Sequence, residues 1–526
     1  MDTKALRQKI LDLVIRGKLV PQDPNDEPAE VLLERIRVQK QQMLKEGKLK
    51  KKDIKNDTII FKGEDNLHYE KFQDGTVKCI EDEIPFEVPE GWAWARVRDI
   101  AMVKGGKRLP KGASFSEEIT THAYIRVTDM KNHSVNISNL RYISDEIFSA
   151  IKNYTIAKDD LYVTIAGTIG VAGEIPDKLD GMNLTENAVK ITNIAINKSF
   201  LCIILQTDFV QQQFQDKTHQ VAMPKLALER ILSTLIPICP SVQQLQIVDR
   251  FQICDNFLST IDTEKEELQK IVSLSKSKIL DLAIRGKLVL QDPNDEPASV
   301  LLGRIRAEKE ELIKQGKIKR DKKESVIFKG DDNSYYLRTG GVEESLENWR
   351  FDDLPETWEI CCLGELCDYG DCINVNTEDI AEDAWILDLE DIEKDTGMVL
   401  KKVTKAQRNS VSTKHKFHFG QVLYSKLRPY LNKVVLSDAD GYCTSEILPL
   451  EFKNCVLPEY ARYYLMSSTF ITYANHCSYG VKMPRLGTTD GKKAIFSLPP
   501  LSEQKRIVET IDFCFMQLNK ISEALA

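Results

Sequence analysis

An internal repeat, carried by one long segment and a series of short markers, runs through the chain, and it constrains the fold more than any other feature. KILDLVIRGKLVPQDPNDEPAEVLLERIR at 9–37 recurs as KILDLAIRGKLVLQDPNDEPASVLLGRIR at 278–306, with 25 of 29 positions identical. Shorter markers follow in the same order, namely IIFKGEDN (59–66) and VIFKGDDN (326–333), VPEGW (88–92) and LPETW (354–358), and MPKL (223–226) and MPRL (483–486). A period of roughly 260 residues is far longer than that of a solenoid, so the pattern predicts one large unit duplicated.

Similarity between the two copies is uneven. Segments 1–66 and 270–333 are nearly identical, whereas 93–222 and 359–482 share almost nothing beyond the markers at their boundaries. Neutral drift would spread differences more evenly over both cores. The pattern therefore predicts two like frames that meet one kind of partner twice, and two unlike inserts that meet different targets.

The frames carry a long amphipathic helix. The 45 residues between Pro240 and Gly286 contain no Gly or Pro, and apolar residues recur there in 4,3 steps, as in a coiled-coil seam. A continuous helix of this length would measure about 65–70 Å; a break around Asp262–Lys265 is the alternative. The same pattern returns in two pieces at the chain ends, which predicts two long antiparallel helices, one of them split, around a pseudo-two-fold axis. The predicted seam residues are Ile247, Phe251, Leu258, Ile261, Leu268, Val272, Ile279, Leu282, Ile507, Ile511, Leu518, Ile521, Ile10 and Leu13.

Each insert alternates aromatic or β-branched residues with turn signals, for example in HAYIRVTDM (122–130) and QVLYSKLRPYLNKVVL (421–436). We therefore predict an α+β fold with two globular domains on a helical frame. The expected divisions are an N-terminal helical region (1–66), a first recognition domain (84–240), a central helical region (241–333), a second recognition domain (351–500) and a C-terminal helix (501–526).

Composition narrows the function classes. A net charge of −8 argues against a uniformly basic nucleic-acid binder, but residues 396–500 hold 15 Lys and Arg against 6 Asp and Glu. The local electrostatic field, rather than the net charge, decides where a polyanion binds, so a basic surface remains possible within residues 396–500. No apolar run approaches the ~18 residues needed to span a bilayer, and the N-terminus lacks a signal peptide's apolar block. A cytoplasmic protein with reduced thiols is expected.

Motifs for chemistry are missing from the sequence. There is no Asn/Asp-Pro-Pro-aromatic motif of an adenine methyltransferase, no G-x-x-x-x-G-K-[ST] phosphate loop and no H-E-x-x-H. Cys361, Cys362, Cys367 and Cys372 cluster without paired ligand spacing, and His415 and His418 are read as surface residues. We therefore expect neither a catalytic residue nor a metal site.

These features together resemble a known family. The elements concerned are the W-x…LGEL opening, the LYSKLRPYLNK and LYVTIAGTIG strands, the closing PLSEQKRIV and the GKLVPQDPNDEPASVLLERIRAEK-like segment. They look like those of specificity subunits of type I restriction–modification systems, and the likeness occurs twice, over nearly the whole chain. The resemblance implies a non-catalytic subunit in which two target-recognition domains each read half of a split DNA sequence. It implies as partners double-stranded DNA, two modification (methyltransferase) subunits and, through the complex, restriction (endonuclease and translocase) subunits. No cofactor is expected on this chain, while the assembled complex is expected to use S-adenosylmethionine, with ATP and Mg²⁺ when restriction subunits are present.

Residue chemistry suggests which side chains meet DNA, because phosphates need Lys or Arg, and Arg, Asn and Gln read base edges. Lys426-Leu427-Arg428 corresponds roughly to Thr164-Ile165-Ala166 of the first insert, so base contacts cannot be copied between the halves. The glycines near 167 serve either close approach to DNA or a tight turn, and the residues around the MP elements either bind DNA or start a helix. The DNA-binding candidates are Lys104, Lys107, Arg108, Lys111, Gly167, Thr168 and Lys225 in the first insert, and Lys426, Arg428, Tyr430, Lys433, Lys482 and Arg485 in the second.

Two other functions stay open. One is a self-contained DNA methyltransferase or nuclease whose catalytic domain has no recognisable motif. The other is a coiled-coil adaptor whose inserts bind proteins.

Overall fold

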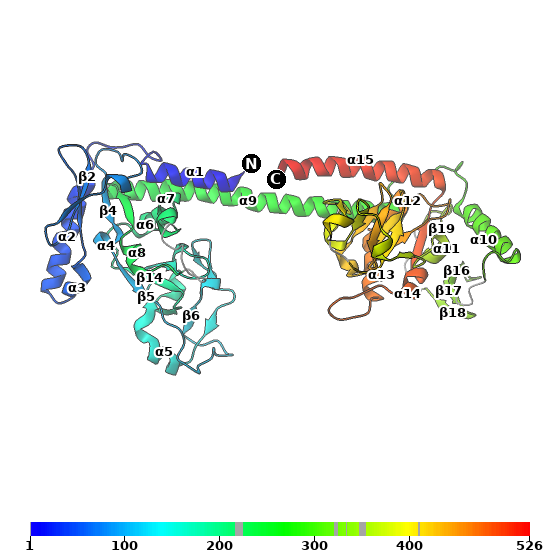
Figure 1. Cartoon of the computed structure of the whole chain (residues 1–526), viewed down its shortest axis with the longest axis horizontal. Helices are drawn as coiled ribbons and strands as arrows, with labels where there is room; N and C mark the ends of the chain where they lie inside the picture. The colour runs from blue at the N-terminus through cyan, green and yellow to red at the C-terminus, as the bar shows by residue number, and fades with distance from the viewer. Residues whose placement is uncertain are drawn as a thin grey trace. The chain divides into compact units, whose positions relative to one another are not determined.

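The computed structural model describes residues 2–215, 225–319, 325–332, 334–346, 354–408 and 411–525. The chain divides into two compact units, Met1–Glu264 and Lys265–Ala526, and the boundary falls inside helix α9 (Ser241–Ile284) (Figure 1). Residues Met223 and Pro224 of the first MP element lie outside the described residues. In the part of the chain that is described, no helix is long and apolar enough to cross a bilayer.

Each unit contains an antiparallel helical pair. In the first, α1 (Thr3–Ile15) lies along the early part of α9, where Arg7 Nε lies 2.6 Å from an Asp255 carboxylate oxygen and the Thr3 hydroxyl donates to Asp262 at 2.6 Å. In the second, α15 (Leu501–Leu525) lies along the later part of α9, where Lys276 Nζ donates to Asn519 Oδ1 at 2.6 Å. α9 runs without interruption through residues 262–265, so the alternative of a broken helix is wrong.

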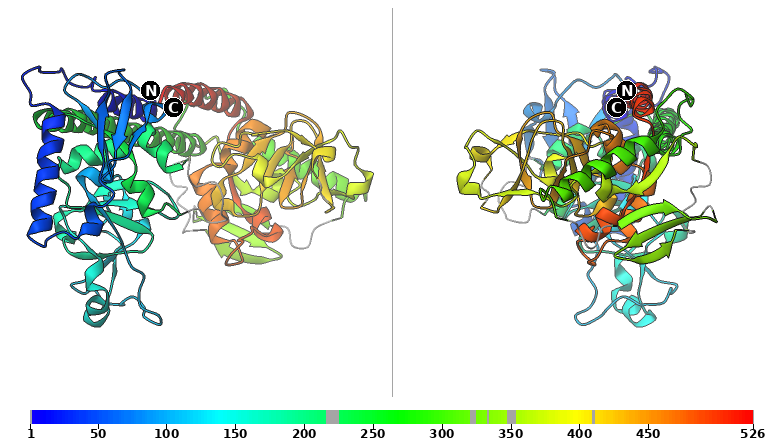
Figure 2. Two further views of the ribbon diagram at one scale, coloured as in Figure 1. Left: turned by 60° about the vertical axis from the view of Figure 1, so that its left-hand side comes forward. Right: turned by 90° about the vertical axis from the view of Figure 1, so that its right-hand side faces the viewer.

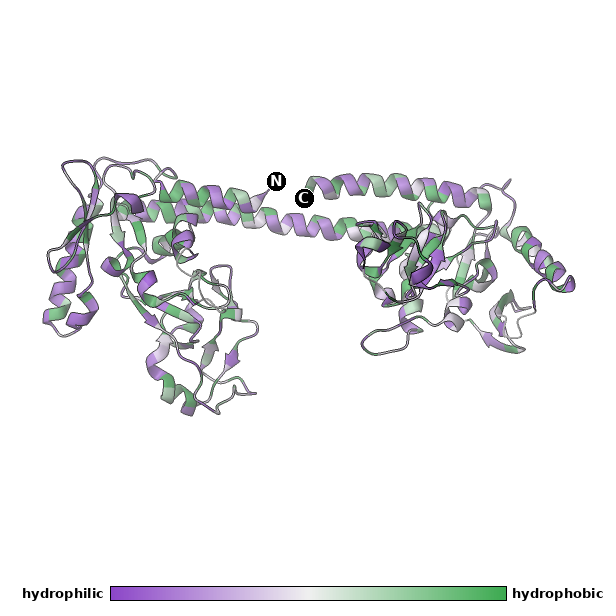
Figure 3. Cartoon of the chain, viewed as in Figure 1, coloured by the Kyte–Doolittle hydropathy of each residue, from purple (hydrophilic) through white to green (hydrophobic). Residues whose placement is uncertain are grey.

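Burial along the seam follows the heptad pattern except at Leu268 and Ile521. Ile247, Phe251, Leu258, Val272, Ile507 and Ile511 are buried, and Ile261, Ile279, Leu282, Leu518, Ile10 and Leu13 are half-buried. Leu268 and Ile521 are 44% and 46% exposed, contrary to the prediction. Residues 266–271 of α9 are all exposed, and α15 is within a turn of its end at Ile521. A heptad position is buried only where neighbouring elements cover it, and Figure 3 shows the apolar residues of these helices mixed with polar ones.

After each helical pair the chain makes a tight joint. Gly17 has φ +65°, and a Cβ there would lie 2.5 Å from Pro89 Cγ and 3.0 Å from the Trp92 ring. Gly286 has the same φ, and its Cβ would lie 2.4 Å from Pro355 Cγ. Only glycine fits a left-handed position under such close packing. The repeated RGKL and Pro-x-x-Trp markers therefore recur together because they pack against each other.

A small module follows each joint. In the first unit it consists of α2 (Ala29–Lys45), α3 (Lys51–Ile54) and the sheet β1 (Ile59–Lys62), β2 (His68–Lys71) and β3 (Val77–Cys79). In the second it consists of α10 (Ala298–Lys314) and the sheet β16 (Ser325–Lys329), β17 (Tyr335–Thr339) and β18 (Val342–Ser345). The views of Figure 2, with that of Figure 1, show that α2 turns away from the line of α1 rather than continuing it.

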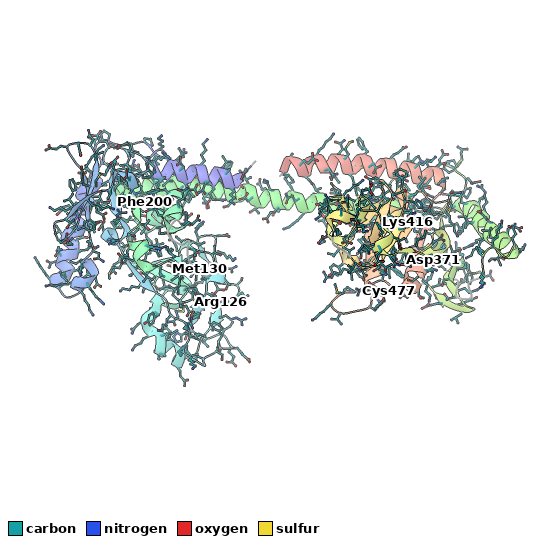
Figure 4. All side chains as sticks on the ribbon, in the orientation of Figure 1. Arg126, Met130, Phe200, Asp371, Lys416 and Cys477 are labelled. Atoms are coloured by element: carbon teal, nitrogen blue, oxygen red, sulfur yellow. The ribbon has the colours of Figure 1, made fainter. Side chains whose placement is uncertain are left out.

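The first recognition domain is α+β. β4 (Ala93–Arg96) pairs with β15 (Leu235–Ile238), and helices α4 (Val97–Ile100), α5 (Asp145–Ile151), α6 (Lys198–Leu205), α7 (Asp208–Gln215) and α8 (Leu228–Leu232) accompany two four-stranded sheets. One sheet has the order β12 (Ala172–Glu174), β11 (Leu161–Thr164), β14 (Ala188–Thr192), β5 (Met102–Gly105). The other has the order β10 (Thr155–Ile156), β13 (Met182–Leu184), β6 (Ala123–Ile125), β9 (Arg141–Tyr142). Phe200 of α6, labelled in Figure 4, lies in the core shared by this domain, α1 and α9.

The second recognition domain repeats this plan with different residues. β19 (Glu359–Cys362) pairs with β28 (Ile495–Leu498), and helices α11 (Leu363–Leu366), α12 (Pro458–Leu465), α13 (Ser468–His476) and α14 (Thr488–Lys493) accompany two sheets. One has the order β25 (Val434–Leu436), β24 (Val422–Ser425), β27 (Ile447–Leu450). The other has the order β20 (Ile373–Val375), β23 (Lys414–Phe417), β26 (Gly441–Thr444), β21 (Trp385–Leu387), β22 (Val403–Thr404).

A buried aspartate shows how the two domains keep a plan while changing residues. Asp129 accepts from the Arg126 amide, and Asp391 accepts from the Asp388 amide, both at 2.9 Å, at equivalent turns after β6 and β21. The guanidinium that neutralises Asp129 comes from Arg126 itself (Figure 4), at 2.6 Å. The one that neutralises Asp391 comes from Arg408, at 2.7 Å. The charge balance is conserved although the position of its arginine is not.

Candidate nucleic-acid interface

In the first domain three loops meet at one end of the β12-β11-β14-β5 sheet. The loop after β5 is bound by Gly106 N, which donates to Ala188 O at 3.1 Å, and by Lys107 N, which donates to Leu184 O at 2.9 Å. The loop after β11 is bound by Ile165 N, which donates to Asn187 O at 2.8 Å. The turn 185–187 therefore holds the other two loops together.

Lys104 lies in β5 itself rather than in the loop, whereas Lys107, Arg108 and Lys111 follow the strand; all four side chains are exposed. Lys107 Nζ lies 5.4 Å from the centre of the Tyr154 ring. Arg108 is 77% exposed and forms an ion pair with Glu186 at 3.0 Å, which holds it beside the turn. A solvent-exposed pair of this kind contributes little to stability, so the guanidinium can turn to another anion at small cost.

The glycines of the second loop have two different roles. Gly170 has φ +87°, and a Cβ there would lie 2.6 Å from Gln211 Oε1, whose own amide donates to Gly170 O at 2.9 Å. Gly167 has φ +79°, with open space around the position of a Cβ. The turn geometry thus requires both glycines, while Gly167 and Thr168 are the part of the loop exposed to solvent.

In the second domain the corresponding loop meets the segment that carries the MP element. Leu486 N donates to Lys426 O at 3.0 Å, and Arg428 N donates to Pro484 O at 2.7 Å. Lys426 N donates to Glu446 O at 3.0 Å, as Ile165 N does to Asn187 O in the first domain. The structure thus brings the two groups of candidates from this insert, near 428 and near 484, into one place.

The DNA-binding candidates of the second domain differ in how far their side chains are exposed to solvent. Tyr430 is 48% exposed and Lys482 is exposed, while Lys426 is half-buried at the edge of the loop. Arg428 has a left-handed backbone (φ +50°), and its buried Nε has no hydrogen-bond partner among the residues that are described. A buried unpaired donor next to an exposed loop is a candidate for binding an acceptor on a ligand.

Two candidates are already engaged inside the domain. Lys433 Nζ donates to Leu389 O at 2.6 Å, and burial lowers the pKa of this amine. Arg485 donates to both carboxylate oxygens of Glu446 at 2.9–3.1 Å. These two side chains hold the loops in place in this structure rather than presenting a cation to solvent.

The strand register refines the correspondence between the inserts. Thr164 pairs with Ala188 in the first domain, and Ser425 pairs with Ile447 in the second. Leu226 N donates to Ile165 O as Leu486 N donates to Lys426 O, both at 3.0 Å. Lys426 therefore matches Ile165, one residue away from the rough correspondence expected from the sequence.

Sequence reasoning missed the residues of the turn itself. Asn187 is exposed at the centre of the three loops, and Glu446 occupies its position in the second domain. Neither residue is among the candidates predicted from the sequence, which are mainly cations. The Thr-Glu-Asn segment before a strand, with an amide able to read a base edge, was the available signal.

The cysteines and histidines singled out above have internal partners. Cys361, Cys362 and Cys367 are buried, and burial raises the pKa of the Cys361 and Cys367 thiols. His415 is buried, so its interpretation as a surface residue is wrong; its ring is hydrogen-bonded to Ile447 O at 2.8 Å, and burial lowers its pKa. Within the described residues, no group of three potential ligands converges on a point that could hold a metal ion.

Comparison with known proteins gives consistent matches. The family model for the type I restriction modification DNA specificity domain matches residues 89–271 and again 355–524. The chain is 27% identical to the type I restriction enzyme EcoAI specificity subunit of Escherichia coli, over 98% of this chain and 90% of that protein. It is 28% identical to the EcoEI specificity subunit of the same organism, over 69% of this chain and 61% of that protein. The crystal structure of the HsdS subunit from Thermoanaerobacter tengcongensis aligns over 84% of this chain and 93% of that one, with 17% identity and a TM-score of 0.42.

Proposed function

Since the chain belongs to the type I restriction–modification DNA specificity family, we propose that it binds double-stranded DNA at a bipartite, asymmetric sequence, with one recognition domain for each half-site. It supplies recognition rather than chemistry. The catalytic steps of modification and cleavage belong to other subunits of the complex.

The observation that carries this proposal is the pairing of like frames with unlike interfaces. The joints at Gly17 and Gly286 have the same geometry, and the same loops converge in each domain. The side chains on those loops differ at nearly every position, as with Asn187 against Glu446 and Ile165 against Lys426. An asymmetric two-part site requires two recognition domains of the same fold that present different side chains to the DNA.

The frames support a stoichiometry of two modification subunits per chain. Packing at the joints explains the repeated glycines and tryptophans, but it does not explain the identity of exposed residues. Val31 and Val300, 48% and 44% exposed, are such a pair. Pro24 and Pro293 are another pair that is identical and exposed in both units. One partner that meets both frames would keep these surfaces alike.

The remaining members of the complex follow from the family. Restriction subunits join through the assembly rather than through a separate site on this chain. S-adenosylmethionine is bound by the modification subunits, and ATP and Mg²⁺ are used when restriction subunits are present, with no cofactor on this chain. We place the complex in the cytoplasm, where its DNA substrate lies.

Selection of bound duplexes from a randomised library, followed by sequencing, tests the proposal. The expected result is two unrelated half-sites separated by a gap of unspecified sequence. A single continuous site or a perfect palindrome would contradict the two-reader arrangement. Binding without any sequence preference would favour the adaptor alternative, and cleavage or methylation by the isolated chain would favour the self-contained enzyme.

A further inference from the structure

Asn187 and Glu446 occupy the same position at the two candidate interfaces. Each directly precedes the strand that pairs with the central strand of its sheet, β14 in the first domain and β27 in the second. The backbone carbonyl of each accepts a hydrogen bond from the first residue of the neighbouring loop, Ile165 or Lys426. The backbones thus have the same role, and the two side chains are free to differ.

A second pair of positions faces the first. Lys225 precedes Leu226, and Arg485 precedes Leu486, and these two leucine amides make equivalent hydrogen bonds. In the second domain the two positions are coupled, because Arg485 Nε and Nη2 both donate to the Glu446 carboxylate. In the first domain the same positions hold an amide and an exposed amine.

The surroundings of Asn187 leave its side chain accessible. The residue is exposed, whereas the neighbouring Glu186 carboxylate is already paired with Arg108 at 3.0 Å. Among the hydrogen bonds between described residues, Asn187 takes part through its backbone carbonyl and its backbone N–H, the latter donating to Thr185 Oγ1 at 3.5 Å. The exposed loop at Gly167 and Thr168 lies beside it, with open space above Gly167.

On the basis of the proposed function, we propose that Asn187 reads an adenine in the first half-site, and that Glu446, held by Arg485, makes no such contact in the second. A side-chain amide offers one donor and one acceptor that match N6 and N7 of adenine. A carboxylate cannot make that pattern and is repelled by phosphates unless a cation neutralises it, as Arg485 does. The two domains therefore differ in specificity at one equivalent position.

Asn187→Ala in the full chain tests this assignment by selection from randomised duplexes. The variant is expected to lose preference for an adenine at one base pair of one half-site and to bind the original site about 10–100-fold more weakly. The other half-site should be unchanged. Asn139→Ala is the matched control, because Asn139 is exposed in the turn before β9, at the other sheet of the same domain. A melting temperature equal to that of the unaltered chain shows that the fold is intact.

The double variant Asn187→Glu with Lys225→Arg supplies a second test by copying the pair of the other domain. It should keep the second half-site and lose the adenine preference in the first. If the unaltered chain selects two half-sites and Asn187→Ala selects the same bases with the same affinity, this inference is wrong while the proposed function stands. A uniform loss of affinity over all sequences would also overturn it, since that is the mark of a phosphate contact. If the unaltered chain selects no sequence, it is the proposed function that fails.

Discussion

Arg96 and Glu70 form an ion pair inside the first unit, with Arg96 Nη2 2.9 Å from Glu70 Oε2 and both side chains only 7% exposed. The pair joins the β1–β2–β3 module to the first recognition domain. At the equivalent positions of the second unit lie Cys362 and Leu337, both buried in one apolar cluster. The same junction is therefore ionic in one unit and apolar in the other.

Exchanging these pairs should show strong coupling. Arg96→Cys alone should destabilise the first unit by about 3–5 kcal/mol, because it leaves the buried Glu70 carboxylate without its partner. Glu70→Leu alone should cost less, because Arg96 Nη2 keeps Glu83 Oε2 at 2.8 Å. The double variant should recover most of the stability that Arg96→Cys loses, since the second unit shows that an apolar pair fits this junction. Hydrogen exchange of amides in residues 68–96 measures the effect. Arg338→Ala, which removes a half-exposed ion pair with Glu343, is the control and should cost less than about 1 kcal/mol. Additive single effects would contradict the coupling.

Asp99 should make the first unit less stable as pH rises. Burial raises the pKa of this carboxyl to about 6, above its value of about 3.9 in the unfolded chain. Between these values the folded state binds more protons than the unfolded state, so stability falls from about pH 4 to pH 6 and then levels off. The expected loss is about 3 kcal/mol. Asp99→Asn should remove this part of the pH profile, and identical profiles for both proteins would contradict it.

Lys426 and Lys433 should respond differently to replacement by alanine. Lys426→Ala should weaken binding to all sequences and reduce the slope of log affinity against log salt by about one unit, as for a phosphate contact. Lys433→Ala should instead lower the melting temperature, because its amine donates to Leu389 O within the domain. Equal effects on affinity with unchanged melting would assign both to DNA.

Replacing residues 93–222 with the insert of a relative should change one half-site only. The joint residues Gly17 and Pro89 lie outside the exchanged segment, so the frame is retained. Selection and sequencing of bound duplexes measures the outcome. A change in both half-sites would show that the two domains do not read independently.

Modification subunits should saturate at two copies per chain. Native mass spectrometry of the reconstituted complex measures this number. Val31→Glu and Val300→Glu, each on one frame, should each reduce it to one, because a charge would replace an exposed apolar contact. Saturation at one copy in the unaltered protein would contradict the duplicate surfaces.

The duplication and the helical pattern predicted the architecture well. The split helix, the α+β inserts and the order of the markers all follow from sequence because they depend on periodicity and repetition over long stretches. Leu268 and Ile521 were misassigned because a heptad pattern does not reveal where covering elements stop.

The candidate interface was predicted from the sequence less well than the architecture. Arg485 was chosen as a cation, yet its carboxylate partner Glu446 lies 39 residues earlier in the chain. Lys433 was chosen for its charge, yet its amine is used by a carbonyl 44 residues away. Such pairings depend on tertiary structure, and one sequence gives no signal for them.

The joint at Gly17 and its copy at Gly286 have a genetic consequence. The coding stretches for 9–37 and 278–306 specify 25 identical residues of 29, so one gene encodes nearly the same peptide twice. Unequal crossing-over between two such genes at these repeats would pair a frame from one parent with an insert from the other. Because the joint packs the same residue types in both copies, the frame and the insert of a recombinant chain would fit together there. New combinations of half-sites can thus arise from a single exchange, without a period of misfolded intermediates.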